Sequence, residues 1–389
     1  MRPLLLLSLL SASLNAQVAL TPKEISDGWI NLWDGETMYG WVSEGGAKWH
    51  IANGALVSDV GEYGWLRSAA AFNDYVLKVE YRTGEQGNSG IFLRSAKVGE
   101  PHKTGYELQI WNKTEKYPTG SIVDLIKANK ITRPAPDKWH TYEVFHVGPR
   151  ILAKLDGKKV LDLTDSRSKI GYIGLQHNKN NKIEFRNVRI RPMGLAPIFN
   201  GKNLSGWQEV KASRVEKAPQ WTAKKGMLHV EQGPGQMETK TTYDDFVLQL
   251  DVRPNSKDPK RHPNSGVFFR GIPGQFWTGY ESQIRNEFKD GDRTIPIDTG
   301  TGGIYHFVPA RRVVPNDNTF FTKTIIARGR HISIWINGYM TADWEDPNPE
   351  GTVVASKQAI TKAGVISLQA HDPTTNLDFK NIRIKSLGN

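Results

Sequence analysis

Cysteine is absent from the sequence, which excludes disulfide bonds, a thiol nucleophile and a lipid-anchored lipoprotein signal. Also missing are the Gly-x-Ser-x-Gly elbow, the phosphate-binding loop, the dinucleotide fingerprint and the His-Glu-x-x-His zinc helix. The enzyme classes that depend on those motifs are therefore excluded. The side chains left to carry chemistry are carboxylates, arginines, aromatic rings and a few histidines.

Long hydrophobic runs are scarce. The run at residues 4–10 follows Arg2 and precedes small and polar residues up to Ala16. This order is typical of an export signal, and the run is too short to span a bilayer. We expect residues 1–16 to be a signal peptide cleaved after Ala16. The mature protein is then expected to be periplasmic or secreted, with no transmembrane segment.

The formal net charge is +11, but Lys and Arg are spread along both halves without a dense basic run or a nucleic-acid-binding motif. We therefore expect no nucleic acid partner. An exported location makes an anionic glycan or a cell-surface polymer the more natural attraction for this charge. The alternative is that the charge serves only solubility.

A chain of 389 residues suits two domains of ordinary size, and an internal repeat also indicates two. Its clearest part is a pair of strand patterns, at residues 88–94 and 105–112 in the first half and at 264–270 and 279–286 in the second. A short linker at residues 192–197 separates the halves. We predict domains at residues 17–195 and 196–389.

Many short alternating segments, frequent Gly and Pro, and few amphipathic helical patterns predict an all-β chain. Asp156-Gly157 and Asn337-Gly338 are strong hairpin signals. A longer strand is expected at residues 72–82, with its copy at 243–253. We predict two tandem antiparallel β-sandwiches of the jelly-roll type, whose curved sheets leave a hollow for an extended ligand.

The paired strand patterns carry the candidate site. Because side chains alternate across a strand, an arginine, a carboxylate and an amide converge on one polar surface if the two strands are neighbours. These residues are Arg94, Glu107 and Gln109 in the first half, and Arg270, Glu281 and Gln283 in the second. The alternative is an ordinary solvated outer face. Repetition of the polar residues favours a functional site, although common ancestry of the halves also explains part of it.

The second half has longer loops, at residues 254–263 and between 286 and 300, and elaborated loops often carry function. Asp290, Asp292 and Asp298 could hold a divalent cation through oxygen ligands, but their spacing fits no recognised calcium loop. The second domain is therefore expected to be the better equipped.

His177 and His371 each follow a Leu-Gln strand end, in corresponding places if one residue is inserted. A lone histidine is often structural, whereas a matched pair beside the polar face suggests acid/base chemistry. His306 and Asp298 flank a Thr-Gly-Gly turn and are weaker candidates.

These motifs together resemble the 3-keto-disaccharide hydrolase domain family. The resemblance rests on the Trp-Asp-Gly and Phe-Asn-Gly openings, the Asn-Ser-Gly strands ending in Arg, Tyr-Glu-x-Gln-Ile, Thr-Gly-x-Ile, the Leu-Gln strand ends near His, and the closing strands 183–190 and 377–384. It covers essentially the whole mature chain as two tandem copies. It implies a fold similar to the concanavalin A-like lectins and glucanases.

The resemblance also implies cleavage of 3-keto glycosides by C2 deprotonation, β-elimination and hydration, which needs no spaced carboxylate pair. It suggests His371 or Glu281 as the base, Arg270 with Gln283 or a bound cation at the enolate, and Tyr305 or His306 at the leaving group. Substrate binding is assigned to Asn264, Trp277, Arg94, Glu107, Gln109 and His177. Val123 stands where the second half has Tyr305, so the first domain is interpreted as either a weakened catalyst or a binding copy.

Two other functions stay open. A non-catalytic tandem carbohydrate-binding protein would stack sugar rings on exposed Trp111, Trp277 and Trp344. An ordinary glucanase-type glycosidase would need a Glu-x-Asp-x-x-Glu arrangement, and none is found. A carbohydrate is the expected partner under each interpretation.

Overall fold

A computed structural model describes residues 19–129, 133–179, 181–213, 217–258, 260–354, 357–358 and 362–388. The predicted signal peptide, residues 1–16, lies outside the described residues. Over the described ranges, no helix is long and apolar enough to cross a membrane.

The described chain is almost entirely β-structure, as predicted. Its helices are short: α1 (Pro22–Ser26), α2 (Pro101–Thr104) and the 3₁₀ turn η2 (Lys289–Gly291). Helix α1 forms at this position because Thr21 and Glu24 make a capping box, in which each side chain bonds to the other's backbone N–H.

The first repeat forms one continuous, strongly curled sheet with the strand order β6-β5-β10-β3-β11-β4-β7-β8-β9. Its strands are β1 (Ile30–Asn31), β2 (Trp41–Ala52), β3 (Ala55–Phe72), β4 (Tyr75–Thr83), β5 (Asn88–Ser95), β6 (Tyr106–Trp111), β7 (His140–Val147), β8 (Arg150–Leu155), β9 (Lys158–Thr164), β10 (Gly171–His177) and β11 (Ile183–Pro192).

Strand β3 belongs to both layers of this sandwich. It pairs with β11 up to Ser58 and with β10 from Gly64 onward. Between them, Gly61 takes a φ of +115°, a conformation that residues with side chains rarely adopt. The glycine lets one long strand pass from one layer to the other.

The second repeat divides the same arrangement between two sheets, in the orders β14-β15-β26-β17-β20-β21-β22 and β13-β16-β25-β18-β19. Its strands are β12 (Ala196–Pro197), β13 (Trp207–Lys211), β14 (Gln220–Lys224), β15 (Met227–Glu231), β16 (Gly235–Thr239), β17 (Phe246–Pro254), β18 (Ser265–Gly271), β19 (Tyr280–Ile284), β20 (Phe321–Arg328), β21 (His331–Ile336), β22 (Tyr339–Glu345), β23 (Val353–Val354), β24 (Lys357–Gln358), β25 (Val365–Ala370) and β26 (Asn376–Ser386). Strands β15 and β16 together take the place of β3.

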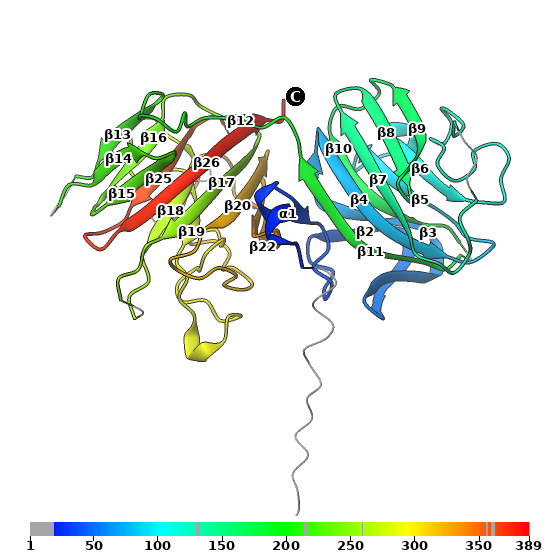
Figure 1. Ribbon diagram of the computed structural model, residues 1–389, viewed down its shortest axis with the longest axis horizontal. Helices are drawn as coiled ribbons and strands as arrows, with labels where there is room; N and C mark the ends of the chain where they lie inside the picture. The colour runs from blue at the N-terminus through cyan, green and yellow to red at the C-terminus, as the bar shows by residue number, and fades with distance from the viewer. Residues whose placement is uncertain are drawn as a thin grey trace, which may run out of the picture.

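Figure 1 shows the two sandwiches side by side, with α1 and the N-terminal segment between them. The chain thus has the predicted all-β fold of two tandem concanavalin A-like jelly rolls. Strand β11 ends at Pro192 and β12 begins at Ala196, so the expected linker lies between sheets that belong to different repeats. The boundary at residues 195 and 196 stays a prediction.

Each sandwich has its own apolar core between its layers. Strand β4 shows how alternation builds it: Leu77 and Val79 are fully buried, while Lys78 and Glu80 lie on the opposite face and are half-buried. The predicted faces of this strand are confirmed. Its predicted start at residue 72 is wrong, because Phe72 ends β3 and residues 73–74 make the turn before β4.

The N-terminal segment connects the two sandwiches. The backbone N–H of Asn31 donates to the Gly338 carbonyl at 2.9 Å, and the Trp335 indole donates to the Asn31 carbonyl at 2.9 Å. Asp34 pairs with Arg311 at 3.0 Å. Trp335 is fully buried and packs with the core of the first repeat, so the second repeat contributes side chains to the first core.

Both predicted hairpins are confirmed. Asp156 and Gly157 have φ of 48° and 77° between β8 and β9, and Asn337 and Gly338 have 48° and 78° between β21 and β22. Two successive positive φ values match the right-handed twist of the flanking strands. The sequence pairs Asp-Gly and Asn-Gly supply residues that tolerate this conformation.

Candidate functional site

The strands of each repeated motif are neighbours, as predicted. Strand β5 pairs with β6 so that Gly90 faces Gln109, and Phe92 faces Glu107. Strand β18 pairs with β19 in the same register, with Gly266 opposite Gln283. In both repeats the glutamate and the glutamine therefore share one face of the sheet.

The glycine of the Asn-Ser-Gly motif makes room for the glutamate. A Cβ atom on Gly90 would lie 2.7 Å from Glu107 Oε1, and one on Gly266 would come closer still to Glu281 Oε1. The carboxylate folds back across the neighbouring strand in both repeats. Sequence reasoning quoted this glycine only as part of the repeat and missed its role.

The predicted convergence of arginine with these residues is wrong. Arg94 and Arg270 have φ of 51° and 56°, at positions where β5 and β18 shift register against their neighbours. This bulge turns each guanidinium away from the glutamate face and into the sandwich. Both side chains are almost fully buried.

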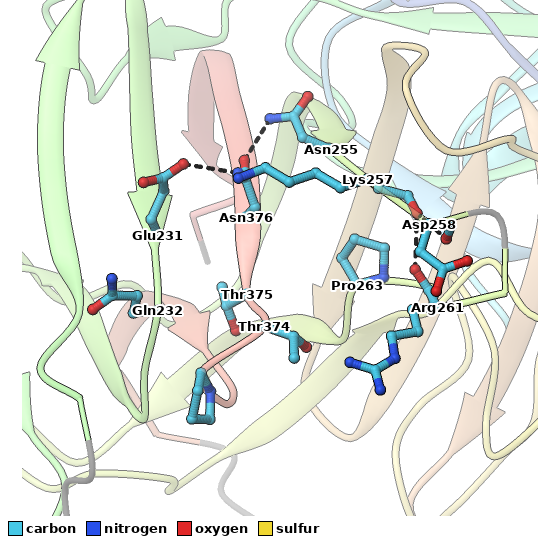
Figure 2. Close-up of a pocket in the computed structure, with 12 residues that line it drawn as sticks. Glu231, Gln232, Asn255, Lys257, Asp258, Arg261, Pro263, Thr374, Thr375 and Asn376 are labelled. Carbon is cyan, nitrogen blue, oxygen red and sulfur yellow. Dashed lines mark hydrogen bonds between the residues drawn. The ribbon is translucent and has the colours of Figure 1, made fainter.

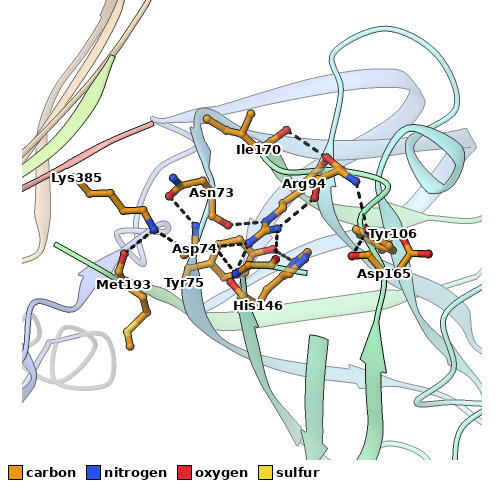
Figure 3. Close-up of polar contacts among 12 residues, drawn as sticks. Asn73, Asp74, Tyr75, Arg94, Tyr106, His146, Asp165, Ile170, Met193 and Lys385 are labelled. Carbon is orange, nitrogen blue, oxygen red and sulfur yellow. Dashed lines mark hydrogen bonds and ion pairs between the residues drawn. The ribbon is translucent and has the colours of Figure 1, made fainter. Parts of the chain in front are cut away.

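Each arginine binds the turn before the next strand. Arg94 pairs with Asp74 at 2.9 Å and donates to the backbone carbonyls of Asn73, Gly148 and His146, as Figure 3 shows in part. Arg270 repeats the pattern with the carboxylate of Asp245 at 2.9 Å. A guanidinium has five N–H donors, and these backbone contacts explain why arginine recurs at this position.

A pocket of about 470 Å³ opens on the glutamate face of the first repeat. Strands β3, β5, β6 and β10, the start of α2 and nearby loops supply its lining, which is Tyr63, Asn88, Glu100, His102, Glu107, Gln109, Trp111, Val123, Gln176 and Asn178. Neither lysine nor arginine is among these described lining residues. Glu107 and Gln109 were predicted for the site, whereas Tyr63, His102 and Gln176 were not.

Glu107 is the buried acid of this pocket, with 5% of its surface exposed. Burial raises the pKa of its carboxyl group to about 7, even though the hydrogen bond from Gln176 opposes the shift. The Gln176 amide donates to Glu107 Oε1 at 2.8 Å. This carboxyl group therefore exchanges protons near neutral pH.

A phenol and two amides surround Glu107. Tyr63 is 45% exposed, but desolvation raises the pKa of its phenol to about 12, and the charge of Glu107 adds to the shift. Gln109 Oε1 accepts from the Ile110 N–H at 3.1 Å, which leaves its NH₂ group for the pocket. Gln176 Oε1 is buried and has no hydrogen-bond partner among the described residues.

His102 lies at the rim of the pocket between two carboxylates. Its Nε2 atom is 3.5 Å from Glu100 Oε2 and 3.5 Å from Asp124 Oδ2. Trp111 ends β6 and presents a half-buried indole to the same pocket. The pocket combines hydrogen-bonding groups with an aromatic face, a combination common in small-molecule sites.

His177 does not lie beside this pocket as predicted. It is fully buried at the end of β10, in alternation with the core residues Ile173 and Leu175, and its Nε2 lies 3.4 Å from the Gly61 carbonyl. Its neighbour Gln176 points to Glu107 instead. Adjacent strand residues face opposite sides of a sheet, which places the amide on the glutamate face and the imidazole on the other.

The second repeat brings together several predicted residues. Glu281 and Gln283 are each 2% exposed, and the Gln283 amide donates to Asn264 Oδ1 at 2.6 Å. The Tyr305 N–H donates to the Glu281 carbonyl at 2.9 Å. Burial raises the pKa of the Tyr305 phenol, and the charges of Asp298 and Glu281 add to the shift.

His306 follows Tyr305 with a φ of 68° and is exposed. The two rings lie 4.1 Å apart between centroids. The backbone here matches the first repeat, because the Val123 N–H donates to the Glu107 carbonyl at 3.0 Å. The predicted correspondence of Val123 with Tyr305 therefore holds in space.

His371 and His177 are not structural equivalents. Gln369 pairs with Gln236 as Gln176 pairs with Trp65, so His371 occupies the place of Asn178, a residue of the first pocket. His371 is 38% exposed, and its Nδ1 lies 2.8 Å from Asp372 Oδ2. That hydrogen bond is the main cause that lowers the pKa of Asp372 to about 2.

A loop covers part of the second repeat's polar face. The Gly274 N–H donates to Glu238 Oε1 at 2.9 Å, and the Trp277 N–H donates to Gln236 Oε1 at 3.1 Å. Trp277 itself is half-buried, with a φ of 66°. Sequence reasoning missed Gln236 and Glu238, although their spacing of two within a strand already placed them on one face.

Trp344, expected to be an exposed stacking platform, instead packs internally. Its ring lies 4.7 Å from that of Phe307 and 6.2 Å from that of Tyr280, between centroids. Of the tryptophans considered for sugar stacking, Trp111 lines the first pocket.

The three candidate metal ligands do not converge. Asp292 accepts hydrogen bonds from the N–H and hydroxyl of Thr294, and Asp298 lies 3.8 Å from Arg285 Nη1. Asp290 lies in η2 with a φ of 51°. Within the described ranges, no group of three or more His, Asp or Glu side chains could hold a metal ion.

Figure 2 shows a second pocket, of about 360 Å³, that the longer loop of the second repeat helps to form. Asn376 donates to Glu231 Oε1 at 2.8 Å, and Asn255 donates to Asn376 Oδ1 at 3.0 Å. None of the predicted site residues lines it. The inserted loop therefore shapes a cavity other than the one at the glutamate face.

Comparison with known proteins gives one family match and several distant likenesses. The 3-keto-alpha-glucoside-1,2-lyase-like domain matches the chain twice, over residues 28–191 and 194–385. The 3-keto-disaccharide hydrolase of Bacteroides thetaiotaomicron is 30% identical over 95 residues, which cover 21% of this chain and 33% of that protein. The chain thus spans about a third of the length of this curated relative.

Two solved structures resemble parts of the chain. A candidate glycosyl hydrolase of Parabacteroides distasonis has a TM-score of 0.41 and 19% identity, covering 46% of this chain and 99% of that one. The carbohydrate-binding module CBM66 of Bacillus subtilis has a TM-score of 0.33 and 21% identity, covering 39% of this chain and 95% of that one.

Proposed function

Because the chain belongs to the family of 3-keto-alpha-glucoside-1,2-lyase-like domains, we propose that it cleaves 3-keto glycosides, and that the pocket of the first repeat is an active site. One observation carries the proposal: Glu107, a buried acid whose burial raises its pKa to about 7, lies in a pocket of about 470 Å³ among amides and aromatic rings. A carboxyl group in this state suits general base catalysis at neutral pH.

The chemistry follows from the ketone at C3 of the sugar. Glu107 takes the proton from C2, and the electron pair of that bond forms the enolate. The enolate then expels the C1 oxygen, which leaves as an alcohol after it gains a proton, and a C1=C2 double bond conjugated with the ketone remains. Water adds across this bond, with oxygen at C1 and hydrogen at C2, and the product is the free 3-keto sugar.

The enolate oxygen needs hydrogen-bond donors aimed at its position. Gln109 is suited to this role because its own Oε1 is occupied by the Ile110 N–H, so that its NH₂ group is available. Arg94, to which the sequence assigned part of the site, binds the turn at Asp74 instead. Amides thus replace the expected cation at the enolate.

The leaving group needs a proton donor. Tyr63 meets this need, since its phenol, with a pKa raised to about 12, stays protonated at neutral pH beside Glu107. Trp111 offers an apolar face for a sugar ring or an aglycone. Asn88 and Asn178 line the same pocket and suit hydrogen bonds to sugar hydroxyls.

The test is turnover of a 3-keto glucoside by the full chain, with release of the aglycone and formation of the 3-keto sugar followed by mass spectrometry. Glu107→Gln keeps the shape of the side chain and removes the base, so we expect a loss of about 100-fold to 10,000-fold in kcat. Glu115→Gln, at a carboxylate that is 73% exposed in the same repeat, is the matched control. Equal turnover by wild type and Glu107→Gln, with Glu281 also changed to Gln, would refute the assignment of both glutamates.

Carbohydrate binding without cleavage is the second candidate function, favoured by the buried Gln176 Oε1 that has no partner among the described residues. Such an atom suits a sugar hydroxyl. Calorimetric affinity for a glycan, together with no product from any 3-keto glycoside, would favour this function over the enzyme. Under either function we propose a periplasmic or secreted location, which N-terminal sequencing of the mature protein would test.

A further inference from the structure

Lys323 is a buried lysine in the core of the second repeat. It lies on β20 with none of its surface exposed. Its Nζ atom is 2.9 Å from the Gln283 carbonyl, 3.1 Å from the Ser282 carbonyl and 2.6 Å from the Ser282 hydroxyl. An ammonium group has three N–H donors, and these three oxygens can accept all of them.

The first repeat has a neutral group at the same place. Tyr142 on β7 pairs with Val79 on β4, as Lys323 on β20 pairs with Leu250 on β17. The Tyr142 hydroxyl donates to the Gln109 carbonyl at 2.8 Å. The two repeats thus bind the same backbone carbonyl, one residue pair beyond the glutamate, with a phenol in one case and an amine in the other.

We infer that the second repeat carries a second proton-transfer site for the same class of substrate, in which Lys323 acts as a positioning residue that keeps Glu281 ionised. This inference rests on the proposed function. The catalytic group would be Glu281, which shares the outer face of β19 with Gln283, while Lys323 reaches the strand from the inner face.

The charges around this pair favour the ionised carboxylate. Glu281 is 2% exposed, and burying a carboxylate without a compensating charge is costly. Desolvation lowers the pKa of Lys323 to about 7, and the charge of Glu281 opposes that shift. By the same attraction, the ammonium group of Lys323 stabilises the negative form of Glu281.

Other groups near the pair do not replace this charge. The strand partners of Lys323, Leu250 and Ile336, are apolar. On the outer face, Tyr305 is a neutral phenol whose raised pKa reflects burial and the charges of Asp298 and Glu281, partly offset by Arg285.

The consequence is a difference in pH range between the repeats. Glu107 has no lysine behind it and becomes a base only as the pH rises through about 7. Glu281 is supported by Lys323 while the amine is protonated, at and below about the same pH. The second site is therefore expected to work on the acid side of neutrality and the first on the alkaline side.

The test compares pH–rate profiles for a 3-keto glucoside between pH 5 and 9. Glu107→Gln should keep turnover with an optimum below pH 7, and Glu281→Gln should keep turnover that rises through about pH 7. In the Glu107→Gln background, Ser282→Leu with Lys323→Tyr installs the first-repeat pair Leu108 and Tyr142. We expect its acid limb to move upward by about one pH unit or more, because an opposite charge is lost.

Each outcome has a separate meaning. No turnover by the wild type would defeat the proposed function itself. Turnover that Glu107→Gln abolishes and Glu281→Gln leaves unchanged would overturn the second site alone. An unmoved acid limb in the Leu and Tyr double variant would overturn the role of Lys323.

A second measurement does not depend on how that variant folds. In the wild type and in Glu281→Gln, the titration of Lys323 can be followed by NMR of isotopically labelled lysine. Loss of the Glu281 charge should lower the pKa of Lys323 below about 7. An unchanged titration would show that the two groups are not coupled and would overturn the inference.

Discussion

Replacing Glu107 by glutamine is expected to stabilise the folded protein while it removes the proposed base. Burial raises the pKa of this carboxyl group from 4.5 to about 7. A folded state that raises the pKa of an acid binds the proton more tightly than the unfolded state does. Stability attributable to Glu107 is therefore greatest below pH 4.5, falls as the pH rises from 4.5 to about 7, and stays low above.

The size of the effect follows from the shift. Each pKa unit corresponds to about 1.4 kcal/mol, so ionised Glu107 costs up to roughly 3 kcal/mol above pH 7. Glutamine carries no charge at any pH, and its carbonyl oxygen can still accept the hydrogen bond that Gln176 donates to Glu107 at 2.8 Å. The variant is expected to exceed the wild type in stability by up to about 3 kcal/mol at pH 8, with a gap that closes towards pH 4.5.

Urea denaturation at pH 4.5, 6, 7 and 8 would measure this gap. The repeats can unfold in separate steps, so the transition that responds to a first-repeat substitution is the one to follow. Glu115→Gln, at an exposed carboxylate, is expected to leave the profile of the wild type unchanged. A Glu107→Gln variant that is less stable than the wild type at pH 8, or a gap that does not change with pH, would refute the reasoning.

Gly90→Ala is expected to lower turnover by about tenfold or more, because its Cβ would lie 2.7 Å from Glu107 Oε1 and misplaced catalytic groups lose rate steeply; Gly84→Ala, whose Cβ meets only Asp137 at 3.7 Å, is the control, and kcat near wild type in both would contradict the role of the glycine. Asp74→Asn is expected to cost roughly 3 to 5 kcal/mol in unfolding free energy, because it leaves the buried guanidinium of Arg94 without its carboxylate. Burial alone would raise the pKa of Asp74, but the hydrogen bonds from Lys385 and Gly148 lower it, so this stabilisation is present above about pH 4 and is lost as the pH falls; thermal melts of Asp74→Asn and wild type that stay equally far apart from pH 7 to pH 2 would count against it.

The fold was predictable from the sequence because its signals are local. Alternation placed Leu77 and Val79 in the core, and the turn pairs at Asp156 and Asn337 marked the hairpins. Each of these signals depends on residues a few positions apart. The pairing of the Asn-Ser-Gly strand with the Tyr-Glu-x-Gln strand followed from their repetition.

The arginines were not predictable in this way. Alternation placed Arg94 beside Glu107, but a bulge with a positive φ turns its side chain into the sandwich, and no sequence rule marks a bulge at a residue other than glycine. The histidines failed through register, since a shift of one residue moves a side chain to the other face of a strand. His177 thereby lies in the core, while His371 takes the place of Asn178.

Lys323 could have been found from the sequence. In the run at residues 321–326 it shares a face with Phe321 and Ile325, and a lysine on the apolar face of a core strand is rare. The pocket at Glu107 could not have been found, because Tyr63, His102 and Gln176 come from segments far apart in the chain.

The shared segment ahead of β2 affects how the duplicated halves can evolve. The Asn31 backbone bonds to Gly338 and Trp335, so a gene encoding either half by itself would produce a sandwich with an uncovered tryptophan or an unfilled gap. Recombination that separates the copies is thereby penalised, and the copies must diverge while joined. A joined pair can lose activity in one copy at little immediate cost, which gives each glutamate freedom to specialise.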